Sequence, residues 1–148
     1  MTWNEIRTED DIGALLNTFG DFHDACLKEM HLWTDTFVQP NLSMSVGIKW
    51  DCHARFLFQR QWDKASAIEI GFHEIRGINV APSPPNYDSI IFTATLLLED
   101  GVFYWAETGN WRPDEPGCND VTWIAAGQMK WRDASDWMGE ELRYGPKT

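Results

Sequence analysis

Apolar residues repeat with a helical period in one part of the chain, residues 8–20. The apolar positions follow the spacing i, i+3, i+4 and i+7 and are Ile12, Leu15, Leu16 and Phe19. Thr8 is a good N-terminal cap, Asp11 lies three residues further on, and Gly20 suits the position just after a helix. This pattern predicts one amphipathic helix over residues 8–20.

After residue 20 the apolar period changes to two, which predicts β-strands. Alternation is clearest in residues 54–61 and 68–72, and the second run is typical of a half-buried strand that residues 75–80 extend or pair with. Looser alternation predicts further strands at residues 25–33 and 42–50.

A hairpin is expected at Asp100-Gly101, because this pair readily adopts the positive φ angles of a tight turn between residues 90–99 and 102–107. Residues 121–132 follow as a strand bulged at Gly127, after a loop over residues 108–120. Ser135 is expected to cap a short closing helix over residues 135–142.

Together these elements predict a mainly β (α+β) chain that forms a single domain over residues 1–148. Successive strands joined by short turns favour an antiparallel meander, closed as a sandwich or a barrel. The N-terminal helix is expected to pack on one end or face.

Charge and tryptophan content limit the partners that the surface favours. Twenty-three acidic residues against twelve Lys and Arg give a net charge of −11, which repels nucleic acid and anionic membranes and attracts a basic protein surface. The same charge could serve solubility alone. Nine Trp residues supply large side chains for the core or for an interface.

The cysteines and the N-terminus indicate a reducing compartment. Cys26, Cys52 and Cys118 form an odd set without the density of a disulfide scaffold. The first residues are polar and lack the basic and apolar regions of a signal peptide. We therefore expect a cytoplasmic protein with free thiols.

No motif in the sequence predicts catalysis or a cofactor. The nucleophile elbow, the phosphate-binding loop and the dinucleotide-binding glycine motif are all absent. The four histidines could converge with Cys52 or Glu69, but none has the short, fixed ligand spacing of a zinc site. These four are His23, His31, His53 and His73. We expect neither a metal nor a cofactor.

His23 and Asp24 form the most suggestive polar pair, just after the predicted helix. The simpler interpretation is structural, in which the pair satisfies backbone groups at the turn into the next strand. The functional alternative is contact with a ligand or a partner.

Gln59 and Arg60 form a polar end to the strand at residues 54–61. The favoured interpretation is structural, with Arg60 paired to a buried carboxylate such as Glu69 on the next strand. Alternatively, the guanidinium group binds an anionic ligand.

Trp111, Asp114 and Glu115 lie in the acidic loop at residues 108–120. An acidic rim around an aromatic anchor would suit a basic protein partner. A solvated loop without a partner is the other interpretation.

Several short motifs together resemble a small family of uncharacterised bacterial proteins. They are Phe22-His23-Asp24-Ala25-Cys26, Asn41-Leu42-Ser43-Met44, Phe58-Gln59-Arg60-Gln61, Tyr104-Trp105 and Trp131-Arg132. A helix followed by Phe-His-Asp-Ala is also similar to immunity proteins of bacterial polymorphic toxin systems. That second resemblance implies that the chain binds a toxin with a basic surface.

The sequence thus predicts a non-enzymatic protein-binding domain, with a toxin-neutralising immunity protein as the specific form that the resemblance implies. The alternative is a small-molecule binder or hydrolase, with a site lined by Trp and His that accepts a sugar or another polar ring. A homo-oligomeric structural protein is the third interpretation.

Overall fold

A computed structural model describes residues 2–145 and confirms a mainly β chain, with one α-helix near the N-terminus of this part. The elements in chain order are β1 (Asn4–Ile6), α1 (Glu9–Thr18), β2 (Ala25–Thr34), β3 (Phe37–Val38), β4 (Met44–Ser45), β5 (Cys52–Arg60), β6 (Ala67–Asn79), β7 (Thr95–Glu99), β8 (Val102–Ala106) and β9 (Trp123–Asp133). Short 3-10 helices cover Gly20–Phe22 and Cys118–Asp120. Within residues 2–145, no helix has the length and apolar character needed to cross a membrane.

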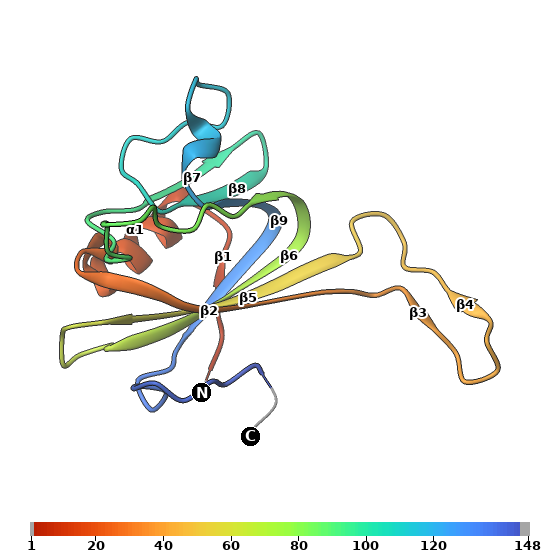
Figure 1. The fold of residues 1–148 in the computed structure, drawn as a ribbon. Helices are drawn as coiled ribbons and strands as arrows, with labels where there is room; N and C mark the ends of the chain where they lie inside the picture. The colour runs from red at the N-terminus through yellow and green to blue at the C-terminus, as the bar shows by residue number, and fades with distance from the viewer. Residues whose placement is uncertain (1, 146–148) are drawn as a thin grey trace.

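The main sheet is antiparallel and is built from two groups of consecutive strands. Its order is β2-β5-β6-β9-β8-β7, and β1 pairs with the C-terminal part of β9. β6 and β9 are far apart in sequence, and their long pairing, from Ile68 with Asp133 to Asn79 with Trp123, joins the two groups. Figure 1 shows the β3–β4 hairpin reaching away from this sheet.

The main sheet is curved but is not closed into a barrel. Its outer strands, β2 and β7, do not pair. Ile91, in the segment before β7, forms an isolated bridge with Ala25 of β2, in which the N–H of Ile91 donates to the carbonyl of Ala25 (2.7 Å). The predicted strand at residues 90–99 therefore begins only at Thr95, because Ile91 has turned toward β2.

Helix α1 begins where the sequence predicted. The Thr8 hydroxyl accepts the N–H of Asp11 (3.2 Å), and the Asp11 carboxylate accepts the N–H groups of Arg7 and Thr8. These backbone hydrogen bonds hold the pKa of Asp11 below its usual value. Gly20 follows the helix with φ of +58°, as expected for the residue that ends it.

The core lies between α1 and the inner face of the sheet. Trp105 is fully buried at its centre, and the rings of Phe22, Phe56 and Phe58 surround it at centroid distances of 5.0 to 6.0 Å. The apolar residues of α1 that reach this core are Ile12 and Leu15, joined by Phe19 just after the helix, with Leu16 packed against its margin.

Strand β6 is buried on both faces in its first half, which the sequence did not predict. Residues 67–72 are all buried, including the carboxylate of Glu69. The prediction of a half-buried strand is wrong here because the C-terminal segment covers the outer face of the sheet.

That segment is irregular, and the predicted helix at residues 135–142 does not form. The Gln59 side chain donates to the carbonyls of Trp137 (2.9 Å) and Gly139 (3.1 Å), while the Glu29 carboxylate accepts the N–H groups of Arg143 and Tyr144. These contacts with β2 and β5 replace the hydrogen bonds that a helix would make.

The buried carboxylate of Glu69 is satisfied by two side chains. Arg132 on β9 donates from Nε to Oε1 (2.7 Å), its Nη2 lies 2.7 Å from the same oxygen, and the Tyr144 hydroxyl donates to Oε2 (2.5 Å). Burial, and then the bond to this carboxylate and its charge, raise the pKa of Tyr144, so the phenol keeps its proton. The expected pairing of Glu69 with Arg60 is therefore wrong.

Two further predictions about the strands are wrong. Of residues 42–50, only Met44–Ser45 form a strand, because this segment lies beyond the main sheet. The bulge is on β6, where Arg76 is the extra residue between Ile75 and Gly77, and not at Gly127. Gly127 lies beside that bulge, where a Cβ atom would stand 2.7 Å from Nη2 of Arg76.

The Arg132→Met variant should lose about 3–5 kcal/mol of unfolding free energy, because it leaves Glu69 charged and buried without its cation. Urea unfolding of the purified variant measures this loss. The double variant Glu69→Leu/Arg132→Met removes both charges and should recover most of it. An Arg132→Met variant as stable as the wild type would contradict this role.

Candidate functional site

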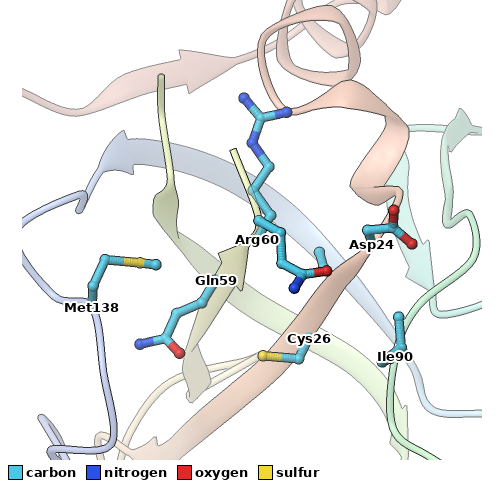
Figure 2. A pocket seen from close by; sticks show the side chains of 8 residues that line it. Asp24, Cys26, Gln59, Arg60, Ile90 and Met138 are labelled. Carbon is cyan, nitrogen blue, oxygen red and sulfur yellow. The ribbon is translucent and has the colours of Figure 1, made fainter. Parts of the chain in front are cut away.

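Three of the residues predicted for a site line one pocket of about 300 Å³ at the start of β2 and the end of β5. Figure 2 shows Asp24, Gln59 and Arg60 around this pocket, together with Cys26, Ile90 and Met138. The structure thus brings Asp24 and Arg60 close together, although they lie 36 positions apart in the sequence.

Most of the polar groups of this pocket are engaged within the chain. The Arg60 guanidinium donates to the carbonyls of Thr18 (3.0 Å), Lys64 (2.5 Å) and Ala65 (2.9 Å), and it lies 4.7 Å from the ring centroid of Phe19. The Gln59 amide holds the C-terminal segment. Arg60 therefore joins the end of α1 to the β5–β6 turn, which leaves little of its hydrogen-bonding capacity for a ligand.

His23 lies beside this pocket at a strained turn. Its Nδ1 is 2.8 Å from the carbonyl oxygen of Phe92, and its Nε2 is 3.4 Å from the Asp24 carboxylate. Asp21, Phe22 and Asp24 all have positive φ angles, which non-glycine residues rarely adopt. This turn buries Phe22 in the core. The hydrogen bond between His23 and the carbonyl of Phe92 therefore stabilises the backbone conformation of the turn.

Trp111 is not an exposed anchor, as the docking interpretation required. It is 4% exposed, its indole N–H donates to the carbonyl of Cys118 (2.9 Å), and its ring packs against Tyr104 and Trp123. Asp114 and Glu115 are exposed on the same loop. The loop is thus an acidic surface held by a buried tryptophan.

A protruding hairpin, residues 35–51, is the most exposed apolar feature of the described chain, and we call it the arm. Its base is closed by the N–H of Asp35 donating to the carbonyl of Asp51 (2.9 Å) and by the Thr36 hydroxyl donating to the Asp51 carboxylate (2.6 Å). Figure 1 shows the arm extending from the ends of β2 and β5, clear of the helix and the rest of the sheet.

Six apolar side chains of the arm are more than half exposed, and Leu42 and Ile48 reach 83% and 89%. They are Phe37, Val38, Leu42, Met44, Val46 and Ile48. Residues 36–48 contain no charged side chain and no histidine. In the sequence, this segment is an alternation of apolar residues without charges. We interpreted it as a strand, because the sequence does not reveal that the segment lies outside the main sheet.

A second feature that the sequence analysis did not locate lies at the root of the arm. Trp33 stacks on His31 at a centroid distance of 5.1 Å and lies 5.7 Å from His53 and 6.4 Å from His73. Three of the four histidines thus gather on the outer face of the sheet, while His23 stands at the other end of β2. Within residues 2–145, no group of three or more His, Cys, Asp or Glu side chains is placed to bind a metal ion.

Asp35, His53 and His73 form a chain of hydrogen bonds. The Asp35 carboxylate lies 2.7 Å from Nε2 of His53, and Nδ1 of His53 lies 3.1 Å from Nδ1 of His73. A carboxylate only accepts, so Nε2 of His53 carries the hydrogen, and a neutral His53 then accepts from Nδ1–H of His73. This arrangement leaves Nε2 of His73 buried without a partner among the described residues.

The surroundings of His73 favour its neutral form. Burial lowers the pKa of His73 below its ordinary 6.5, and the positive charges of Lys130 and Arg55 lower it further. At the arm root, burial and the charge of Asp51 raise the pKa of Cys52, so this thiol is not an activated nucleophile.

Comparison of the chain with protein-family models, curated proteins and solved structures finds no match. Its function is therefore inferred from its own geometry.

Replacing His73 with Gln should change how stability depends on pH. Because the folded pKa of His73 is lowered, the unfolded chain binds a proton as the pH falls through 6.5 while the folded chain resists it. His73 thus makes the wild type lose stability below pH 6.5, and the His73→Gln variant lacks this loss. Urea unfolding from about pH 8 to about pH 5 measures both curves, and parallel curves would refute the effect.

Proposed function

We propose that this chain is a non-enzymatic protein-binding domain that docks through its arm onto a basic protein. The observation that carries the proposal is the set of apolar side chains that the arm presents to solvent, far from the core that could cover them. Exposed apolar surface of this kind typically marks an interaction site. The partner that fits it has an apolar groove surrounded by basic residues.

The arm also offers a backbone edge. β3 and β4 form a two-stranded sheet with no further strand among the described residues, so their outer edges are unpaired. An unpaired edge can accept a strand from a partner, which gives affinity through backbone hydrogen bonds and specificity through alternate side chains.

Charge supports a basic partner. The arm carries no charge between residues 36 and 48, so its apolar side chains enter a groove without desolvating an ion. The net charge of −11 on the whole molecule attracts a basic surface and speeds the encounter. A basic partner is also what the resemblance to immunity proteins of polymorphic toxin systems implies.

The engagement of Arg60 and Gln59 within the fold supports binding over catalysis. Both were candidates for ligand contact, and both donate their hydrogen bonds to backbone carbonyls of the chain. The raised pKa of Cys52 also supports binding over catalysis, because a thiol that keeps its proton is a weak nucleophile.

The double variant Leu42→Ser/Ile48→Ser should bind its partner at least about 100-fold more weakly, since each buried side chain of this size contributes about 1.5–3 kcal/mol. Its melting temperature should match that of the wild type, because both side chains are exposed in the free protein. The partner is first captured from lysate of the native cell with the wild-type chain and identified, and calorimetry with the purified pair then measures the affinity.

Val80→Ser is the matched control, because Val80 is also an exposed apolar residue but lies off the arm and outside the pocket of Asp24 and Arg60. It should bind within about twofold of the wild type. Equal affinities for the arm variant and the control would refute docking through the arm. A captured partner with an acidic binding surface would refute the charge argument.

A further inference from the structure

The outer face of the sheet holds cations around a tryptophan, and this cluster is separate from the arm. Strand register places Arg55, Gly71 and Lys130 in one row across β5, β6 and β9. The ring centroid of Trp3 lies 4.6 Å from Nζ of Lys130 and 5.9 Å from Cζ of Arg55. Because Gly71 has no side chain, the chain of Lys130 lies over it, with Cγ and Cε 3.3 Å from the place that a Cβ atom would take, and both cations gather beside Trp3.

Neither cation of this row is neutralised by a carboxylate. Arg132, which also lies against Trp3 (4.3 Å), is paired with Glu69, but within residues 2–145 no Asp or Glu oxygen lies within 4 Å of the charged groups of Arg55 or Lys130. Glu5 stands opposite Lys130 in the strand register, and even its carboxylate is beyond that distance.

Stacking on tryptophan explains part of this arrangement, because a cation gains about 0.5–2 kcal/mol over an indole ring. It does not explain why two neighbouring cations lack an acidic partner in a chain with 23 acidic residues. Two like charges held near each other repel, and an anion placed between them relieves that repulsion.

We propose that Arg55 and Lys130 bind the anionic oxygens of a small phosphate- or carboxylate-bearing molecule on the outer face of the sheet, beside Trp3. Trp3 fixes the two cations from one side, so their remaining N–H groups are available to a ligand. Arg55 also lies 5.8 Å from the ring centroid of Trp33, which stacks on His31. This ligand realises the Trp- and His-lined small-molecule site that the sequence gave as the alternative, with the addition that the ligand is anionic.

The ligand is small because the net charge of the protein is strongly negative. A long polyanion extends over the acidic remainder of the surface and is repelled there. A small anion contacts the two cations only, and at physiological ionic strength charges beyond about 8 Å are largely screened.

Nuclear magnetic resonance titration with inorganic phosphate and, separately, with citrate tests the site. In the wild type, the indole N–H signal of Trp3 and the amide signal of Gly71 should shift and saturate at millimolar anion. In Arg55→Gln and Lys130→Gln the dissociation constant should rise about tenfold or more, the loss expected for one charge-assisted hydrogen bond.

Lys64→Gln is the matched control, because it removes one positive charge from an exposed site elsewhere and should leave the affinity within about twofold. Circular dichroism verifies that each variant is folded. Tighter binding of phosphate than citrate assigns the ligand to phosphorylated molecules, and the reverse order assigns it to carboxylates.

The inference is overturned if neither anion shifts these signals at millimolar concentration, or if Lys64→Gln weakens binding as much as Lys130→Gln. Stronger binding of long-chain polyphosphate than of either small anion also overturns it. The Leu42→Ser/Ile48→Ser variant should bind the anion like the wild type, so this site and docking through the arm can fail independently.

Discussion

The antiparallel pairing of β6 with β9 is the interaction on which the rest of the structure depends. It runs from Ile68 with Asp133 to Asn79 with Trp123, and it is the backbone pairing that joins the two groups of strands into one sheet. Because this pairing puts β6 in the middle of the sheet, both faces of its first half must be covered. Helix α1 and the aromatic cluster cover the inner face, and the C-terminal segment covers the outer face at Glu69.

The same arrangement decides which surfaces stay uncovered. β2 lies at the sheet edge, and β2 and β5 continue past the region that α1 and the C-terminal segment reach, so the hairpin between them leaves the body as the arm. Further along the outer face, beyond Tyr144, the rows that contain Arg55, Lys130 and His53 are covered by the single side chains of Trp3 and Trp33. Both candidate surfaces therefore lie where the strands extend beyond helix α1 and the C-terminal segment, which cover the rest of the sheet.

The sequence predicted features that depend on neighbouring residues. The capping box of Thr8 and Asp11 and the Asp100-Gly101 turn are set by local hydrogen bonds and backbone angles, and both were predicted correctly.

Features set by distant partners were not predictable. Residues 42–50 alternate like a buried strand but have no sheet to join, residues 135–142 exchange helical hydrogen bonds for contacts with β2 and β5, and Glu69 pairs with Arg132 instead of Arg60. Of the predicted site residues, Asp24, Gln59 and Arg60 do line the same pocket. Periodicity alone could not show that the guanidinium group of Arg60 donates its hydrogen bonds to backbone carbonyls.

The hydrogen-bond chain from Asp35 to His73 connects the two candidate surfaces physically. Asp35 begins the arm, and His73 lies next to Gly71 in the cation-bearing part of the outer face. The charges of Lys130 and Arg55 both lower the pKa of His73, so an anion bound between them weakens that effect and makes proton uptake easier. By linkage, a proton on His73 favours the anion to the same extent. Any such change in protonation alters the hydrogen bond to Asp35, and therefore acts on the residue that fixes one side of the arm base.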